Sequence, residues 1–162
     1  TRMRQGRVGG LLCSSVGGGP GASTEEVPGS AVVLATCGFG GSRSMVRKYI
    51  DEASGSAMAD AWYQGSPHNT GDALAWGEAA GGDLLHMASY QGHATVTDDA
   101  ARKMLVTYGA IVSGGILVNA RGERFGNEDV GYSEFSAAVL AQGPGVVELF
   151  GESVLEACAG TR

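Results

Sequence analysis

The sequence predicts a mixed α/β or α+β fold, and two observations support this class. Short apolar runs typical of strands occur at residues 7–13, 31–35 and 146–150, and stretches with a helical spacing of apolar residues lie between them. In addition, glycine makes up 28 of the 162 residues without a fixed period. This indicates tight turns and close backbone approach rather than a repeat protein.

The first half of the chain predicts two strands and two helices. After the strand at residues 7–13, a loop rich in Gly, Ser and Pro is expected over residues 14–29. The continuous apolar run at residues 31–35 is typical of a strand buried on both faces. Helices are expected at residues 42–51 and 70–80, the second ended by a pair of glycines.

The second half begins with an extended segment and continues with helices and strands. Residues 83–96 are expected to be extended, and residues 97–104 to form a short helical turn. A helix at residues 132–142, a strand at residues 146–150 and a helix at residues 153–159 follow from the spacing of apolar residues.

A hairpin is expected before the first of these helices. The sequence GGILVNARGERFGNE, residues 114–128, has an apolar strand at residues 116–118 and a turn at residues 119–122. A second strand then carries Arg124 and Phe125.

The composition excludes several classes of protein. A net charge of −6 and scattered basic residues argue against nucleic acid as a partner. No apolar run reaches the ~18 residues of a membrane span, and no signal peptide is visible. Three cysteines without a CxxC pair favour a reduced, cytoplasmic setting over a disulfide framework. The three histidines fit no common ligand spacing, so no metal site is expected.

Four segments carry a resemblance to a known family. They are AVVLATCGFGG at residues 31–41, TGDALAWGEAA at 70–80, QGHATV at 91–96, and the hairpin. They resemble VVLATGGFGxN, TGDGxxMAxxAGA, QxHPTx and GGILVNxxGxRFxNE of the FAD-dependent oxidoreductase 2 family. This family includes the flavoprotein subunits of fumarate reductase and succinate dehydrogenase, and its soluble branch contains ketosteroid, urocanate and tricarballylate-type enzymes.

The resemblance implies a fold in two parts. Residues 1–89 are expected to be the end of a Rossmann-like FAD-binding domain, and residues 90–162 the first part of an α+β capping or substrate domain. The strand-GxGxxG-helix unit that holds the pyrophosphate is not found, because GGGPG at residues 17–21 contains a proline and leads into no helix. The chain is therefore expected to be a central fragment, on which missing parts of its own chain pack.

The resemblance also assigns residues to FAD. Ala35, Thr36 and Gly38 are expected to approach the dinucleotide through their backbone, and Asp72 to contact the flavin side. Cys37 stands where the family has glycine. Without the resemblance, a strand-ending turn that binds no ligand is the favoured interpretation of residues 35–38. Capping of the helix alone would also explain Thr70, Gly71 and Asp72, and both roles can hold together.

The catalytic assignment rests on three other residues. The resemblance implies that His93 binds a substrate carboxylate or carbonyl and that the hydroxyl of Thr107 binds the same carboxylate. Fumarate reductases place a proton-donating arginine at the position of Tyr132, and a proton-feeding glutamate and arginine at those of Tyr108 and Ile111. Since all three ionic groups are replaced, a standard fumarate reductase is not expected. Tyr132 can act as an acid or base, or it can simply cap or pack the helix that follows.

The sequence thus predicts a fragment of an FAD-dependent oxidoreductase. It would transfer hydride between the flavin and a small organic substrate, acting on CH–CH groups as the full-length protein. The alternative is a non-catalytic truncated fragment or interaction module that does not bind FAD by itself.

Overall fold

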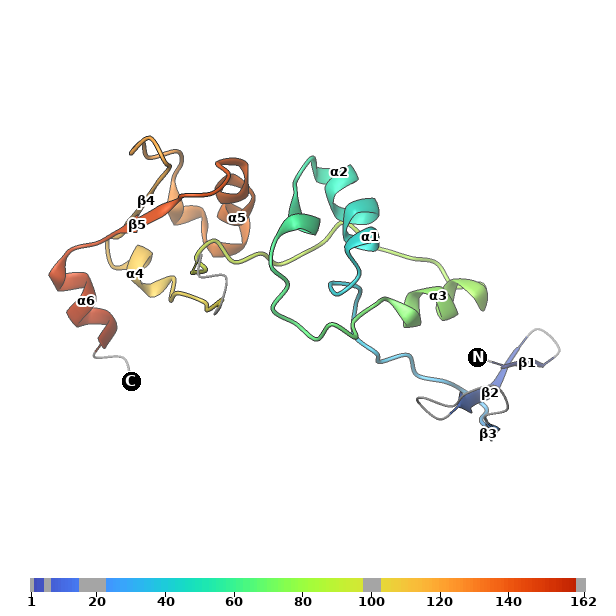
Figure 1. Ribbon diagram of the computed structural model, residues 1–162. Helices are drawn as coiled ribbons and strands as arrows, with labels where there is room; N and C mark the ends of the chain where they lie inside the picture. Colours follow the sequence, from blue (N-terminus) through green and yellow to red (C-terminus); the bar gives the residue numbers. More distant parts are fainter. Residues whose placement is uncertain (1, 5–6, 15–22, 98–102, 160–162) are drawn as a thin grey trace. The chain divides into compact units, whose positions relative to one another are not determined.

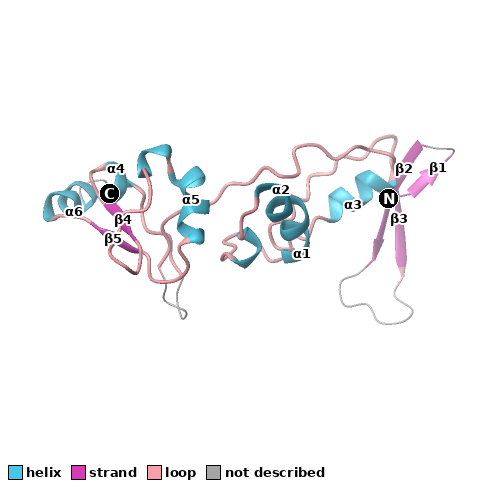
Figure 2. Cartoon of the chain, turned by 90° about the horizontal axis from the view of Figure 1, so that it is seen from above, coloured by secondary structure: helices cyan, strands magenta, loops and turns pink. Residues whose placement is uncertain are grey.

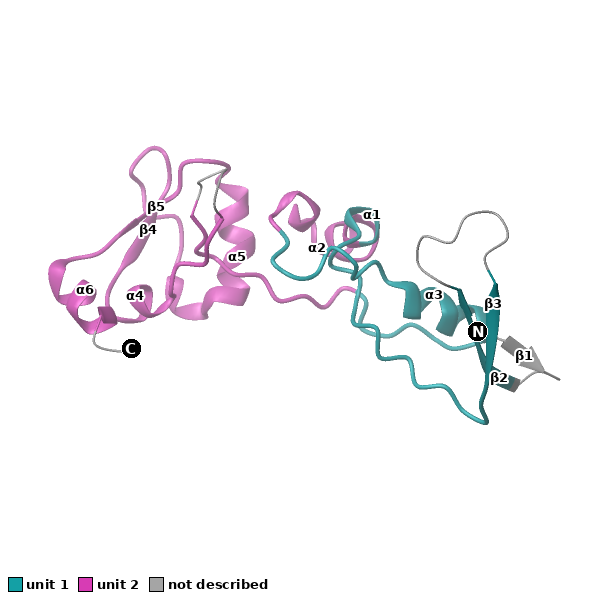
Figure 3. Cartoon of the chain, turned by 60° about the horizontal axis from the view of Figure 1, so that its bottom comes forward, with its two compact units in different colours: residues 1–45, 63–87 teal, residues 46–62, 88–162 magenta. Residues whose placement is uncertain are grey.

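The computed structural model describes residues 2–4, 7–14, 23–97 and 103–159 (Figure 1). It has a mixed α/β architecture of small sheets and short helices, which confirms the predicted class. The chain divides into two compact units: unit 1 comprises residues 1–45 and 63–87, and unit 2 comprises residues 46–62 and 88–162 (Figure 3). None of the described helices is long and apolar enough to cross a membrane.

The structure does not test three of the predictions. The GGGPG segment at residues 17–21 and the centre of the helical turn expected at residues 97–104 lie outside the described residues. The domain division expected at residues 89 and 90 also stays a prediction.

Unit 1 begins with an antiparallel sheet of three strands. Its order is β1 (Arg2–Arg4), β2 (Arg7–Ser14) and β3 (Thr24–Pro28), and Figure 2 shows the long β2–β3 ribbon. β2 confirms the first predicted strand, whereas β3 lies in residues predicted as loop. β3 is exposed along its whole length, so it lacks the apolar alternation that reveals a strand in a sequence. Gly10 lets β3 approach, because a Cβ there would lie 2.2 Å from the carbonyl oxygen of Val27.

The apolar run at residues 31–35 is not a strand, and this prediction was wrong. The run is irregular, and the side chain of Val33 is 88% exposed. A strand needs a neighbour for its backbone hydrogen bonds, and none of the strands in the described ranges pairs with these residues. Apolar composition alone therefore did not produce a strand here.

The first predicted helix is longer than expected. It comprises α1 (Arg43–Val46), the π-helical turn η1 (Arg47–Asp51) and α2 (Glu52–Ser54), and it ends at Gly55 in the left-handed conformation. The carboxylate of Asp51 then accepts hydrogen bonds from the backbone nitrogens at the start of η2 (Met58–Asp60), at 2.7 and 3.0 Å.

The second predicted helix starts later than expected. α3 (Asp72–Ala79) follows Gly71, whose φ of 84° places it in the left-handed region. Gly71 therefore takes the N-cap position predicted for Thr70, whose hydroxyl instead donates to Oδ1 of Asp72 at 3.0 Å. A side chain at Gly71 is disfavoured by this positive φ and by Cβ of Phe39, which would lie 3.0 Å from an added Cβ.

Unit 2 contains a two-stranded sheet surrounded by helices. β4 (Ile116–Val118) pairs antiparallel with β5 (Val147–Leu149) rather than with the second arm of the predicted hairpin. That arm makes a single bridge, between Val118 and Arg124. The helices are α4 (Gly109–Val112), the 3₁₀ turn η3 (Glu128–Val130), α5 (Tyr132–Ala141) and α6 (Glu152–Ala159), of which α5 and α6 confirm the prediction.

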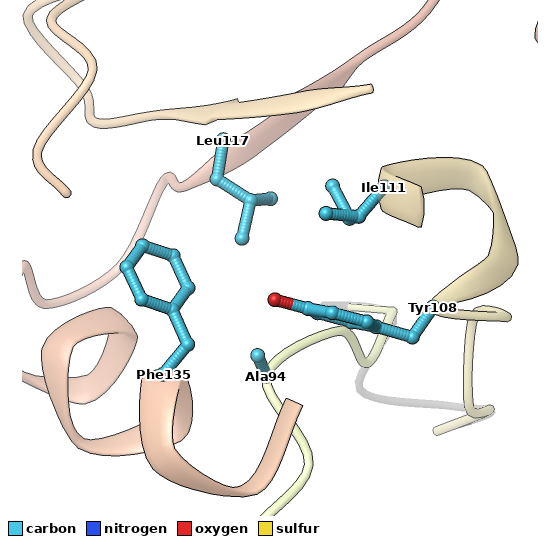
Figure 4. Packing of buried hydrophobic residues seen from close by; sticks show 5 residues of the cluster. All are labelled: Ala94, Tyr108, Ile111, Leu117 and Phe135. Carbon is cyan, nitrogen blue, oxygen red and sulfur yellow. The ribbon is translucent and has the colours of Figure 1, made fainter. Parts of the chain in front are cut away.

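A small hydrophobic core lies between these elements. Figure 4 shows its five buried side chains, with the hydroxyl of Tyr108 pointing into the centre: Ala94, Tyr108, Ile111, Leu117 and Phe135. The ring of Phe135 on α5 also stacks on Phe125, with centroids 5.4 Å apart. The core therefore ties α4, β4 and α5 to the segment that carries His93.

β5 shows an inverted pattern of burial. Val147 and Leu149 are each 48% exposed, whereas Glu148 is half-buried and lies opposite the buried Leu117. Burial raises the pKa of the Glu148 carboxyl, whose Oε1 has no hydrogen-bond partner among the described residues.

Candidate functional site

Three aromatic side chains of unit 2 form the centre of the site. The imidazole of His93 stacks on the phenol ring of Tyr132, with centroids 5.0 Å apart and planes inclined by 26°. Tyr108 meets both rings edge-on, with centroids 5.9 Å from Tyr132 and 6.4 Å from His93. The structure thus brings together the two residues predicted to be catalytic, from segments 39 positions apart in the sequence.

The hydroxyl of Tyr132 has a partner that the sequence interpretation did not assign. Nε2 of Gln91 donates a hydrogen bond to it at 2.7 Å. Gln91 belongs to the QGHATV motif that contains His93, and this proximity was the one signal in the sequence that could have pointed to it.

His93 is held from its other side by Thr95. Nδ1 of His93 lies 3.1 Å from the backbone oxygen of Thr95, and the buried hydroxyl of Thr95 donates to the carbonyl of Val106 at 2.9 Å. The backbone nitrogen of Thr95 donates to Nδ1 at 3.4 Å, and when Nδ1 accepts this bond the ring proton lies on Nε2, which can then donate to a ligand.

Thr107 lies at the start of α4, next to Tyr108. Its exposed hydroxyl accepts a hydrogen bond from the backbone nitrogen of Gly109 at 3.2 Å. A hydroxyl that accepts one bond retains its own proton, so Thr107 can still donate to a ligand.

A pocket of about 390 Å³ opens beside the two tyrosines, Tyr108 and Tyr132. This is within the range of about 300–1,000 Å³ that small-molecule sites occupy. Apolar residues of α4 and β4 and polar residues around η3 complete the lining: Ile111, Val112, Gly114, Gly115, Ile116, Arg124, Asn127, Glu128, Asp129 and Gly131. The pocket can therefore accept a small molecule with an apolar body and a polar group.

An ion pair between the exposed Arg124 and the buried Glu128 fixes the polar wall of this pocket. The carboxylate of Glu128, 2% exposed, accepts hydrogen bonds from Nε and Nη2 of Arg124 at 3.0 and 2.6 Å and from the backbone nitrogen of Leu117 at 2.8 Å. Burial alone would raise the pKa of the Glu128 carboxyl, but the hydrogen bonds from Arg124 and Leu117 outweigh it and lower the pKa. Glu128 is therefore a structural anion rather than a proton donor.

The hydroxyl of Tyr108 forms a hydrogen bond with the same segment. It donates to the backbone carbonyl of Glu128 at 2.6 Å in a buried environment. Burial is the main cause that raises the pKa of Tyr108, and the negative charges of Glu128, Asp129 and Glu148 raise it further. Tyr108 therefore stays a neutral phenol and forms part of the pocket wall.

The residues predicted to contact FAD all lie in unit 1. Ala35, Thr36 and Gly38 form an exposed turn in which Cys37 adopts a φ of 62°, although it is not glycine. A Cβ at Gly38 would meet no atom within 4 Å, so a ligand has room to approach the backbone there.

The residues just before Asp72 pack against the residues that follow this turn. A Cβ at the preceding residue, Gly71, would lie 3.0 Å from Cβ of Phe39, and the backbone nitrogen of Gly41 donates to the carbonyl of Asn69 at 2.9 Å. The two motifs of unit 1 therefore form one local structure. Across the part of the chain that the structure describes, no group of three or more His, Cys, Asp or Glu is arranged to hold a metal ion.

The comparisons with known proteins agree on one family. Residues 2–154 match the profile of a protein family described as FAD binding domain. The chain is 36% identical over 129 residues to a fumarate reductase (cytochrome) of Shewanella frigidimarina, and the match covers 79% of this chain and 21% of that protein. It is 30% identical over 155 residues to a 4-oxocyclohex-2-ene-1-carboxylate 5-dehydrogenase of Sinomonas cyclohexanicum, covering 92% of this chain and 25% of that protein.

A solved structure supports the fold. The structure of 3-ketosteroid-Δ4-(5α)-dehydrogenase from Rhodococcus jostii RHA1 in complex with 4-androstene-3,17-dione matches with a TM-score of 0.57 and 23% identity. The match covers 97% of this chain and 29% of that one. The chain thus spans less than a third of the length of each of these proteins.

Proposed function

Because the chain belongs to the FAD binding domain family, whose profile spans residues 2–154, we propose that it is part of an oxidoreductase that acts on CH–CH bonds of a small organic substrate. FAD is the cofactor of this family. The observation that carries the proposal is the pairing of His93 and Tyr132 beside a pocket lined by the same tyrosine.

The residues of unit 1 fit the cofactor. The exposed backbone of residues 35–38 and the open space at Gly38 allow a flat ligand to approach, and Asp72 follows directly on the same local structure. We assign Ala35, Thr36, Gly38 and Asp72 to FAD on this basis. When bound, FAD accepts or supplies the hydride.

The residues of unit 2 bind the substrate and move a proton. His93 donates the N–H of Nε2, and Thr107 its hydroxyl proton, to a carbonyl or carboxylate group of the substrate. Tyr132 exchanges a proton with the carbon next to the one that gains or loses hydride. The backbone N–H of Thr95 binds Nδ1 of the imidazole and so places the ring proton on Nε2.

Two observations favour a substrate other than fumarate as the main one. Tyr108, Ile111 and Tyr132 carry no charge, although the resemblance places charged groups at all three positions in fumarate reductases. The relative from Sinomonas is named for a ring ketone that carries a carboxylate. A pocket with an apolar wall on α4 and a polar wall at η3 suits a molecule of that kind.

The domain boundary belongs to the same proposal. Residues 1–89 would complete a Rossmann-like FAD-binding domain, and residues 90–162 would begin the capping domain. The exposed apolar side chains of Val33 and Leu85, 88% and 74% exposed, support the idea that further parts of the protein pack on this chain.

The spectrum of the purified full-length protein tests the function. We expect a visible flavin absorbance band that FAD restores after removal. Loss of that band in a double variant, Gly38→Val with Asp72→Ala, would place the cofactor at unit 1. A colourless protein that FAD cannot reconstitute would overturn the proposal.

A second candidate function follows from the exposed run at residues 31–35. Residues 31–35 have no strand partner among the described elements. The second candidate is therefore that the 162-residue chain by itself is an interaction module that does not bind FAD. Isothermal titration of the 162-residue chain with FAD decides this, since micromolar binding contradicts the second candidate.

A further inference from the structure

The two tyrosines that line the pocket differ in how their hydroxyl protons are used. Tyr108 donates its proton to the carbonyl of Glu128 at 2.6 Å. Tyr132 instead accepts a hydrogen bond from Nε2 of Gln91 at 2.7 Å, so its own proton is not used in that contact. Of the two phenols beside the pocket, Tyr132 is therefore the one whose proton is available to a bound molecule.

Gln91 completes a three-sided support for the Tyr132 ring. His93 stacks on one face with centroids 5.0 Å apart, and Tyr108 meets the ring at an angle of 68°. These two contacts fix the plane of the ring, but they leave the direction of the O–H bond free. The amide of Gln91, which reaches the hydroxyl across 41 residues, fixes this direction.

Burial does not force this contact. Tyr132 is 37% exposed, and Gln91 is exposed as well. Gln91 does not line the pocket, whereas Tyr132 does. Gln91 therefore reaches the pocket lining through its contact with the Tyr132 hydroxyl.

We propose that Gln91 is a positioning residue that holds the Tyr132 hydroxyl with its proton directed toward the pocket. The inference rests on the proposed function for the chemistry that it serves. When a double bond of the substrate is reduced, one carbon receives hydride and the proton of the Tyr132 O–H bond passes to the adjacent carbon. The phenolate oxygen keeps the electron pair and remains hydrogen-bonded to Gln91. Dehydrogenation reverses each of these transfers.

Substitutions of similar shape separate the possible roles of Gln91. Gln91→Met keeps the length of the side chain and removes the hydrogen bond. Gln91→Glu keeps the shape but can only accept a hydrogen bond, so it would draw the proton of Tyr132 away from the pocket. Gln64→Met, at an exposed glutamine of unit 1, makes the same chemical change away from the site and serves as the control.

The first measurement needs no turnover. With 3-fluorotyrosine placed at position 132 of the full-length protein, the ¹⁹F resonance should move in Gln91→Met and in Gln91→Glu and stay in place in Gln64→Met. A resonance unchanged by both substitutions at Gln91 would overturn the proposal, because the contact would then be absent in solution.

The second measurement follows the flavin by stopped flow in the FAD-loaded protein. Fumarate is mixed with the reduced form and 4-oxocyclohex-2-ene-1-carboxylate with the oxidised form, and the probe that reacts is used for all variants. We expect Tyr132→Phe to slow the step by about 10²-fold or more, as loss of a general acid does. Gln91→Met should slow it roughly 10-fold without raising the half-saturating concentration, and Gln91→Glu should slow it further.

A double variant provides the decisive comparison. If Gln91 acts through Tyr132, adding Gln91→Met to Tyr132→Phe should cause no further loss. Effects that multiply would overturn the proposal and assign Gln91 a general structural role. If neither probe reacts with a protein that does hold flavin, the substrate class of the proposed function fails. The ¹⁹F resonance alone then decides whether Gln91 holds Tyr132.

Discussion

The hydroxyl of Tyr108 donates a hydrogen bond to the backbone carbonyl of Glu128 at 2.6 Å, and so joins α4 to the segment that precedes α5. This bond is buried, and it links the hydrophobic core to the polar wall of the pocket. We expect Tyr108→Phe to lower the free energy of unfolding by about 1–3 kcal/mol, because the carbonyl of Glu128 loses its partner away from water. Urea denaturation of the full-length protein measures this. A loss below a few tenths of a kcal/mol would contradict the assignment.

The pair of Arg124 and Glu128 predicts a specific dependence of stability on pH. The pKa of the Glu128 carboxyl is lowered in the folded protein, so its contribution is fully present above the pKa of an unfolded glutamate, about 4.3. The contribution is lost as the pH falls through the lowered pKa, because the unfolded chain then binds more protons. Asp51 acts in the same direction, since hydrogen bonds from Ala59, Ser56 and Met58 outweigh its burial and lower its pKa.

The variant Arg124→Met distinguishes the contribution of Glu128 to this pH dependence from that of Asp51. It leaves Glu128 buried without its cation, so we expect the variant to be less stable than the wild type at neutral pH. Acidification should then cost the variant less stability than the wild type, because protonation relieves the buried charge. Unfolding curves between neutral and acidic pH give the difference. Parallel pH profiles for the two proteins would contradict the role of Arg124.

Gly92 is predicted to be intolerant of a side chain. A Cβ at this position would lie 2.1 Å from Oγ of Ser136 on α5. Gly92→Ala should therefore cost about 1–3 kcal/mol of stability, and it should also move Gln91 and His93 relative to Tyr132. The added substitution Ser136→Gly removes the clash and should recover part of the loss. Gly151→Ala, where a Cβ meets no atom within 4 Å, is the matched control and should cost less than Gly92→Ala, because it changes only the N-cap of α6.

Cys37 carries backbone strain at the turn assigned to FAD. Its φ of 62° costs a residue with a Cβ about 1–2 kcal/mol. Glycine removes this strain, but its greater flexibility in the unfolded chain offsets part of the gain. We expect Cys37→Gly to raise the free energy of unfolding by up to about 1 kcal/mol, and Cys37→Val to lower it. Thermal unfolding of the two variants in parallel checks the order. A glycine variant less stable than the valine variant would show that the turn has a different conformation.

The sequence predicted those elements whose secondary structure is determined by the spacing of their own apolar residues. α5 follows from Phe135 and Val139, which recur at helical spacing, and β5 follows from its short apolar run. The run at residues 31–35 has the strongest strand pattern in the chain but no neighbouring strand among the described residues, so the pattern did not determine the outcome. Pairing depends on distant parts of a protein, which local composition does not contain.

The candidate site was predicted in part, for a related reason. The resemblance singled out His93 and Tyr132, and the structure places their rings in contact. It gave no role to Gln91, because the place of Gln91 in the motif of His93 does not reveal a hydrogen bond to a residue 41 positions away. The N-cap at Thr70 was a reasonable expectation from side-chain chemistry, but the left-handed conformation of Gly71 took its place. The roles of Thr107 and of the residues assigned to FAD stay predictions.

The inverted burial of β5 has a practical consequence for handling this polypeptide. Val147 and Leu149, each 48% exposed, share one face of a strand at the edge of a two-stranded sheet, and Phe150, 46% exposed, follows directly. Edges of this kind pair readily with other chains, and natural proteins protect them with charge, proline or a covering segment. The one charge of β5, on Glu148, is turned toward the interior and gives no such protection. Self-association through β5 is thus the expected difficulty when these residues are produced by themselves, and a lysine at position 149 is the natural solubilising change.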